Sequence, residues 1–239
     1  MKPNSKRFID AFNQIDYALR AQHNFKRSMN FSDMIRRSAA LSSVVRKYED
    51  YLIDFSRLRN AIIHNSNDEY IIAEPHDDIT LKIERFAKIL TTPPSVLDTI
   101  KSNDVLVVEY DVKILDVIKL VSKSGYSNIP VYKNNTLIGV ANGQRVLNYL
   151  GFALEGGADL SDYIKTKNIE DIVTCEEKKS YYAVASERLS IEEALNMFYS
   201  NRKLLVVLIT HTGSMQEPPI GIVTVSDIMD MNTVLDNYN

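Results

Sequence analysis

A threonine and an aspartate stand three residues apart near the end of the chain, in residues 221–227 (GIVTVSD). The β-branched run predicts a strand that ends in a turn and opens a helix. At such a junction the Thr224 hydroxyl, the Asp227 carboxylate and the free N–H groups of the first helical turn face one small volume. This set of groups suits a ribose diol and a phosphate. The alternative is a plain helix cap, in which Thr and Asp are common.

A second group that could carry chemistry is Arg59, Asn60 and His64, near the end of a predicted helix. A histidine can transfer protons near pH 7, and an arginine can hold a phosphate with two hydrogen bonds. Together they could cleave RNA by letting its 2′-hydroxyl attack the adjacent phosphate. Arg59 would stabilise the charge that develops, and His64 would act as acid or base. This reaction requires no metal.

Two other interpretations of this second group stay open. His64 can end its helix as a C-terminal residue that the helix dipole favours. Alternatively, Arg59 and His64 can bind phosphate without cleaving it. Asn60 and His64 are four residues apart and therefore share one face of an ideal helix. An Arg followed five residues later by a His is a common coincidence, so the pair needs its surroundings to be interpreted.

Residues 1–92, which surround Arg59 and His64, are predicted to be an all-helical module, interrupted by a break at residues 65–68 and a short extended segment at residues 70–73. Apolar residues recur at helical spacing over residues 5–26 and 77–90, and residues 34–64 predict one long helix or two abutting helices. The simplest architecture is a four-helix-bundle-like domain. Pro93 and Pro94 end it as a stiff hinge, because prolines forbid helix continuation. The second domain then spans residues 93–239.

The second domain repeats one unit. Residues 139–145 (GVANGQR) follow a β-rich run as residues 221–227 do, and the helical segments that precede the two runs also match. The pattern predicts two β-α-β-β-α units, about 94–150 and about 165–233, in an α+β or α/β fold. In the first copy Asn142 and Arg145 stand in the places of Thr224 and Asp227.

The doubled unit resembles a pair of CBS domains, through its apolar strand before an amphipathic helix, its Ile-Pro-Val strand start and its Gly-strand-Thr-x-x-Asp turn. The resemblance implies two units packed sheet to sheet and a sensor rather than a catalyst. It also implies an adenosine nucleotide (AMP, ADP or ATP) as the ligand of a cleft. Carried over, Thr224 is the phosphate-side hydroxyl and Asp227 the ribose-binding carboxylate. The backbone near Ala183 and Val184 would contact the base.

The two copies depart from the CBS pattern in different ways. Asn142 can still donate to a phosphate, but Arg145 cannot accept hydrogen bonds from ribose hydroxyls. We therefore expect at most one standard nucleotide site, in the second copy. Arg145 either faces a phosphate in its own cleft or lies solvated on the surface. In the second copy residues 203–207 (KLLVV) replace the Ile-Pro-Val start, which changes the expected adenine slot.

The helical domain resembles a HEPN domain in one motif, residues 58–65 (LRNAIIHN), where a polar residue follows the Arg and the His lies at the helix end. The resemblance implies a small helical bundle that forms a homodimer. It further implies a metal-independent endoribonuclease in which Arg59 and His64 are catalytic and Asn60 supports them, in a cleft shared by both protomers. Some HEPN domains are inactive binding modules, so whether this one is an enzyme stays open.

Composition limits the remaining possibilities. The chain of 239 residues has a single cysteine, Cys175, which excludes an intrachain disulfide and a thiolate metal cluster and favours a reducing cytoplasm. No apolar run approaches the ~20 residues that span a bilayer, so no membrane partner is expected. Residues 1–64 hold 12 Lys and Arg against 6 Asp and Glu, a mildly basic balance that leans toward RNA.

These observations lead to one main hypothesis. The CBS pair binds an adenosine nucleotide and regulates a HEPN-like helical homodimer that cleaves RNA without a metal or a catalytic cofactor, with the Pro93-Pro94 hinge passing the signal. The alternative is a non-catalytic nucleotide-binding or scaffold dimer whose helical module recruits a partner. A third possibility is that the CBS pair is structural and binds no ligand.

Overall fold

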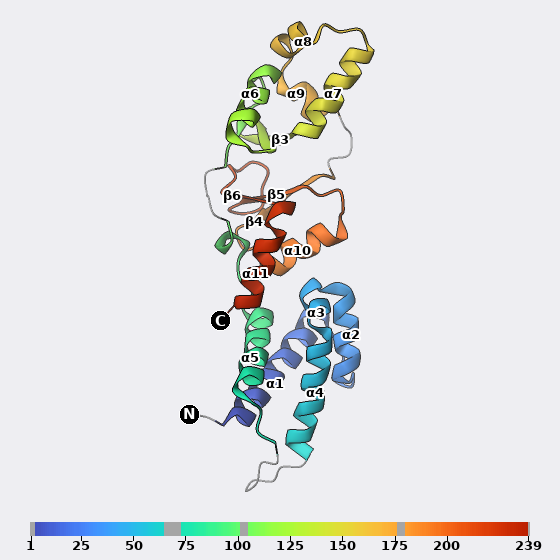
Figure 1. The fold of residues 1–239 in the computed structure, drawn as a ribbon, viewed down its shortest axis with the longest axis vertical. Helices are drawn as coiled ribbons and strands as arrows, with labels where there is room; N and C mark the ends of the chain where they lie inside the picture. Colours follow the sequence, from blue (N-terminus) through green and yellow to red (C-terminus); the bar gives the residue numbers. More distant parts are fainter. Residues whose placement is uncertain (1–2, 65–72, 101–104, 176–179, 239) are drawn as a thin grey trace. The chain divides into compact units, whose positions relative to one another are not determined.

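The computed structural model describes residues 3–64, 73–100, 105–175 and 180–238. Figure 1 shows the order of the elements along the chain. By the clustering of their contacts, residues 1–95, 190–199 and 229–239 form one compact unit, and residues 96–189 and 200–228 form a second. The helices α1 (Asn4–His23), α2 (Phe31–Leu41), α3 (Ser43–Lys47), α4 (Glu49–His64) and α5 (Asp77–Thr91) belong to the first unit.

The core of the first unit is built on α1, which contacts α2, α4 and α5. Phe8, Phe12, Ile15 and Leu19 recur on one face of α1 and are all buried. The Phe8 ring meets the Phe55 ring of α4 edge to face, with 5.7 Å between the centroids. The amphipathic pattern of α1 therefore places its apolar face in the core, and the helical N-terminal region predicted from the sequence is confirmed.

Residues 34–64 do not form one or two helices as predicted; the chain breaks at Ser42 and again at Tyr48. Ser42 has extended backbone angles, and its hydroxyl accepts a hydrogen bond from the Val45 N–H at 3.0 Å. A serine side chain in this position caps the following helix. No Pro or Gly marks the break in the sequence, and the apolar residues keep their helical spacing across it. The break therefore had no signal in the sequence.

The first unit also contains most of α10 (Ile191–Ser200) and α11 (Ile228–Asn237). At the α2–α3 break the Ser42 hydroxyl donates to the Glu192 carboxylate, and the Ser43 N–H donates to Asn196 Oδ1 at 2.8 Å. Glu192 is only 6% exposed. Burial, together with the neighbouring charge of Glu193, raises the pKa of the Glu192 carboxyl, and the Ser42 hydrogen bond offsets this only in part.

The second unit contains two three-stranded sheets of the same topology. In each sheet the first strand is parallel to the second and the second is antiparallel to the third. The strands are β1 (Val108–Glu109), β2 (Asn128–Lys133), β3 (Thr136–Asn142), β4 (Tyr182–Ser186), β5 (Val206–Thr210) and β6 (Gly221–Thr224). The mixed α/β fold and the doubling predicted from the sequence are thus seen in the sheet order.

The two sheets share a core. Tyr132, Leu137 and Val140 of the first sheet pack with Tyr182, Val206 and Leu208 of the second sheet and with Tyr181. The Tyr181 hydroxyl donates to the Val140 carbonyl at 3.0 Å, which satisfies its buried polar atom. The two copies therefore join through a mixed aromatic and aliphatic layer.

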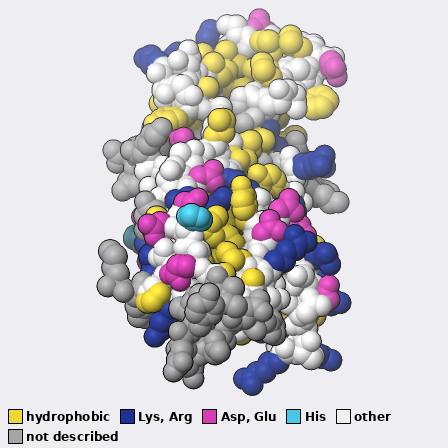
Figure 2. Space-filling view, turned by 60° about the horizontal axis from the view of Figure 1, so that its bottom comes forward, with side chains coloured by type: hydrophobic (Ala, Val, Ile, Leu, Met, Phe, Trp, Pro, Cys, Tyr) yellow, Lys and Arg dark blue, Asp and Glu magenta, His cyan; other side chains and the backbone are white. Residues whose placement is uncertain are grey.

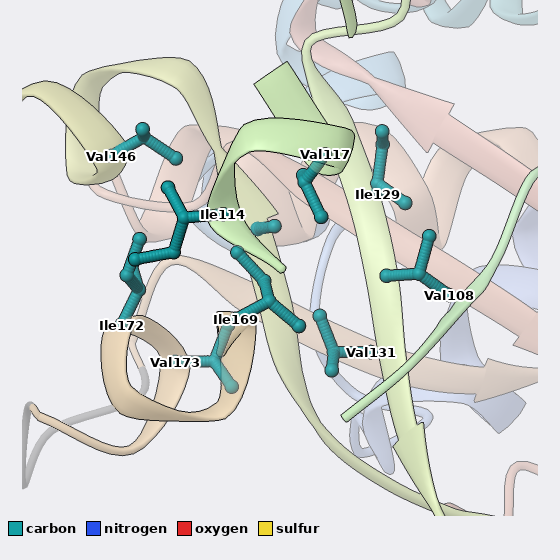
Figure 3. Packing of buried hydrophobic residues seen from close by; sticks show 10 residues of the cluster. Val108, Ile114, Val117, Ile129, Val131, Val146, Ile169, Ile172 and Val173 are labelled. Carbon is teal, nitrogen blue, oxygen red and sulfur yellow. The ribbon is translucent and has the colours of Figure 1, made fainter. Parts of the chain in front are cut away.

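The outer face of the first sheet is covered by helices α6 (Ile114–Ser124), α7 (Gly143–Glu155) and α9 (Ile169–Thr174), with α8 (Leu160–Thr166) beside them. In Figure 3, Ile114 and Val117 of α6 lie beside Ile169 and Val173 of α9, over Val131 of β2. A short 3₁₀ helix, η1 (Val96–Asp98), precedes β1. No helix in the described ranges is long and apolar enough to cross a membrane.

Burial of Glu192 predicts a pH-dependent gain in stability for Glu192→Gln. The folded-state pKa lies above the ordinary 4.5, so the native protein loses stability as pH rises from about 4.5 to that pKa. Glutamine can still accept the Ser42 hydrogen bond but carries no charge. Thermal unfolding should show the variant more stable than the native protein at pH 7 and equal to it below pH 4. A constant difference across this range would contradict the burial argument.

Gly139 and Gly151 form a matched pair of substitutions. A Cβ on Gly139 of β3 would lie 2.7 Å from the Val173 Cβ, whereas a Cβ on Gly151 of α7 would meet nothing within 4 Å. Gly139→Ala should destabilise the protein by about 1–3 kcal/mol through overpacking. Gly151→Ala should stabilise it by about 0.5–1 kcal/mol, because alanine is the better helix former. Denaturant unfolding measures both changes, and equal effects would contradict the packing of β3 on α9.

Candidate functional site

The turn that contains Thr224 and Asp227 is a strand-to-helix junction, as the sequence predicts. Strand β6 ends at Thr224, the 3₁₀ turn η2 (Val225–Asp227) follows at once, and α11 begins at Ile228. The backbone N–H and the hydroxyl of Thr224 both donate to Asp227 Oδ2, at 2.7 and 2.9 Å. The Asp227 N–H closes a capping box on the Thr224 side chain.

The capping role of this pair does not exclude a ligand role. Both hydrogen bonds that Asp227 accepts end on the same carboxylate oxygen, Oδ2. A carboxylate has two oxygens and about four lone-pair sites, so the group can still accept hydrogen bonds from a ribose diol. The box holds the carboxylate in one orientation.

Thr224 and Asp227 line a cavity of about 330 Å³ in the second unit. This volume is at the lower end of the range for small-molecule sites. Its wall combines apolar side chains with hydroxyl, amide and carboxylate groups. The lining residues are Ile100, Val105, Leu106, Gly125, Tyr126, Ser127, Asn128, Ile222, Thr224, Ser226 and Asp227.

The cavity brings together parts of both copies. Thr224, Ser226 and Asp227 come from the second copy, whereas Val105 and Leu106 come from the segment before β1 in the first copy. Sequence reasoning missed Val105 and Leu106, as it also missed Tyr126 and Asn128. The signal was available in the repeat: Leu106 and Ala183 hold equivalent positions, eight residues before the helix starts Ile114 and Ile191.

The structure does not bring Ala183 and Val184 to this cavity. They lie in the middle of β4, where they pair with Val207 and Leu208 of β5. Their predicted role as base contacts was assigned within the second copy, but the segment that faces Thr224 belongs to the first.

Asn142 and Arg145 are not among the residues that line the cavity, although Asn142 is bonded to Asn128, which is. Asn142 caps α7 by accepting from the Gln144 N–H at 2.9 Å, and its amide donates to Asn128 Oδ1 at 2.7 Å. The guanidinium carbon of Arg145 lies 3.5 Å from the centroid of the Tyr181 ring, a cation–π contact. Arg145 is therefore stacked on the aromatic layer that joins the two copies and is half-buried rather than solvated.

Arg59 and Asn60 lie on α4 at the edge of a second cavity, of about 560 Å³, in the first unit. Arg59 donates to Asn60 Oδ1 at 3.3 Å, and its guanidinium carbon lies 5.8 Å from the Phe12 ring centroid. Its buried Nε makes no hydrogen bond to the described residues. His64 is the last residue of α4, and its side chain is outside the part of the chain that the structure describes.

Two further arginines line this second cavity, and each has a carboxylate partner. Arg20 pairs with Asp16 at 2.8 Å and also donates to the Lys26 and Met29 carbonyls, whereas the Arg36–Asp33 distance is 3.5 Å. On the face shown in Figure 2, acidic and basic side chains lie close to one another. Within the described ranges, no cluster of three or more His, Cys, Asp or Glu could hold a metal ion.

The chain has distant likenesses among solved structures. No curated protein matches the chain in sequence. A signal-transduction protein with CBS domains from Burkholderia ambifaria is 15% identical, over 61% of this chain and 96% of its own, with a TM-score of 0.44. The CBS domain of a bacterial CNNM/CorC family Mg²⁺ transporter, solved with ATP, is 18% identical over 64% of this chain and 97% of its own, with a TM-score of 0.45.

An archaeal homolog of g-AMPK from Methanocaldococcus jannaschii is 17% identical over 77% of this chain and 63% of its own, with a TM-score of 0.47. The match to a family is more specific, because it concerns the sequence itself. Residues 97–151, which include β1, α6, β2 and β3, match the CBS domain family, and the chain therefore contains a CBS domain at these residues.

Proposed function

We propose that the cavity at Thr224 and Asp227 binds an adenosine nucleotide (AMP, ADP or ATP) as a regulatory ligand. The observation that supports this most directly is the capping-box carboxylate on the wall of a cavity of ligand size. The ribose hydroxyls would donate to Asp227, and the base would lie against Val105, Leu106 and Ile222. The phosphate would face Thr224 and the N–H groups of the turn.

The two copies are not equivalent in this proposal. Arg145 stands where the second copy has its carboxylate, and its guanidinium is stacked on Tyr181. A guanidinium has no acceptor for ribose hydroxyls. The chain therefore binds one nucleotide, at the second copy's turn. The single cysteine, Cys175, is exposed, and an exposed thiol suits a reducing cytoplasm, where we place the protein.

Isothermal titration of AMP, ADP and ATP into the native protein and Asp227→Asn tests the nucleotide site. The variant should bind at least about tenfold more weakly, because a hydrogen bond to a charged group contributes about 1.5–3 kcal/mol. Asp116→Asn, which removes an exposed carboxylate of α6, is the matched control and should keep the native affinity. Arg145→Ala should also keep it and leave the stoichiometry at one. Equal affinity in Asp227→Asn would show that the assignment of the site is wrong.

We further propose that the helical module cleaves RNA without a metal, through Arg59, Asn60 and His64, as a homodimer. The supporting observation is the Arg59 guanidinium at a polar cavity, with a buried Nε that has no hydrogen-bond partner among the described residues. A guanidinium at the edge of such a cavity can bind a phosphate through its terminal nitrogens. The alternative is a scaffold module that recruits a partner without catalysis. In that case Arg59 would bind the partner, and His64 would only end helix α4.

An RNA cleavage assay in the presence of a chelator separates these two roles. Arg59→Ala should reduce cleavage by about 10²–10³-fold, the usual effect of losing one group that stabilises developing charge. His64→Ala should reduce it by about 10²–10⁴-fold, the usual contribution of a positioned acid or base. Arg57→Ala, on the same helix and paired with Asp54 at 2.8 Å, is the matched control and should keep full activity. Light scattering of the same samples should show a dimer. If the native protein leaves RNA intact under every condition, the scaffold role replaces the nuclease role.

A further inference from the structure

The helix α11 starts directly at the proposed nucleotide turn. The capping box joins Thr224 and Asp227, and Ile228, the next residue, is the first residue of α11. No loop residue separates the two elements. A ligand that donates hydrogen bonds to Asp227 therefore acts on the 3₁₀ turn η2, from which α11 continues directly.

The other end of α11 is anchored to the helical module. The Asp236 carboxylate accepts hydrogen bonds from Lys47 Nζ at 2.9 and 3.0 Å and from the Tyr48 hydroxyl, and Arg85 donates to the Asp236 carbonyl. Burial by itself would raise the pKa of the Asp236 carboxyl, but the bonds from Lys47 and Tyr48 and the nearby positive charges lower it overall. The anchor is therefore the charged Asp236 carboxylate, which accepts hydrogen bonds from Lys47 and Tyr48.

Two contacts beside this anchor strengthen it. The Tyr238 hydroxyl donates to the Thr92 carbonyl at 3.0 Å, at the end of α5. Lys88 Nζ lies 4.8 Å from the centroid of the Tyr238 ring. The end of α11 is thus attached to both α5 and the α3–α4 junction.

Tyr48 connects this anchor to the helix that carries the candidate RNA site. It is the residue between α3 and α4, its carbonyl accepts the Leu52 N–H at 3.1 Å, and its ring packs on Phe86 with 4.5 Å between centroids. Helix α4 runs from Glu49 to His64 and includes Arg59 and Asn60. A change in how Asp236 holds Tyr48 therefore acts on the first turn of α4.

We propose that α11 transmits nucleotide occupancy at Asp227 to helix α4 through the Asp236–Tyr48–Lys47 contact. The ligand and RNA ends of this proposal rest on the proposed function, but the mechanical link rests on α11 itself. Helix α11 has ten residues and is about 15 Å long, and its backbone hydrogen bonds join each turn to the next, so it offers a continuous path from Asp227 to Asp236. At the Pro93-Pro94 hinge predicted from the sequence, the Pro94 carbonyl accepts a hydrogen bond from the Ile191 N–H at 3.0 Å.

Amide hydrogen exchange of peptides spanning residues 47–58 tests the link in the full-length protein. Asp227→Ala removes the carboxylate at the start of α11 and should change exchange in these peptides about fivefold or more, within the usual range of coupling between sites. In an Asp236→Ala background the same substitution should change it less than about twofold. Tyr48→Phe, which keeps the ring packed on Phe86, should uncouple the two ends in the same way. Thr233→Ala, whose hydroxyl bonds within α11, is the matched control and should preserve the coupling.

The same peptides measured with saturating AMP, ADP or ATP separate the relay from the ligand site. Nucleotide should reproduce the change at residues 47–58 in the native protein and lose it in Asp236→Ala, while binding to that variant persists. Coupling between Asp227 and Asp236 without any nucleotide binding would leave the relay standing and remove the ligand assignment. The relay would be overturned if the change in exchange at residues 47–58 were the same in the native protein and in the Asp236→Ala background. This applies both to the change caused by nucleotide and to the change caused by Asp227→Ala.

Discussion

The face-to-face packing of the two sheets is the constraint on which the candidate nucleotide site depends. All five residues of β5 and the four central residues of β2 are buried, so each sheet must be covered on both faces. One face of each sheet is covered by the other sheet, through the layer of Tyr132, Tyr182 and Leu208. This packing brings the segment before β1 to the end of β6, and the cavity forms where they meet.

This constraint explains which parts of the site were predictable from sequence. The Thr224–Asp227 turn is local: its strand, its spacing and its cap are all encoded within seven residues, and the structure has them as predicted. The base side of the cavity is set by the pairing of the two copies. A repeat shows that two units are equivalent, but it does not show which copy completes which cleft. For this reason the prediction named Ala183 and Val184, whereas the cavity holds Val105 and Leu106.

The connection of the helical module to α10 and α11 was also beyond sequence reasoning, for a related reason. Its main contacts join residues far apart in the chain, such as Ser42 with Glu192 and Tyr48 with Asp236. Each of these side chains has an ordinary surface interpretation when only its neighbours in sequence are known. A buried Glu192 in particular is unusual, because carboxylates are rarely buried without a partner. Ser42, at the break between α2 and α3, is that partner, because its hydroxyl donates to the Glu192 carboxylate.

The asymmetry of the two copies agrees with the route proposed for the signal. The first copy's turn opens α7, which contacts β3, α8 and α9 inside the second unit. The second copy's turn opens α11, whose end bonds the helical module through Asp236. The copy that has the carboxylate proposed to bind ribose, Asp227, is therefore the copy whose following helix bonds to the helical module. Arg145 stands where the first copy would need a carboxylate, and its guanidinium stacks on Tyr181 in the layer between the two sheets. The first turn therefore contributes to the packing of the sheets, whereas the ligand proposed above is assigned to the second turn.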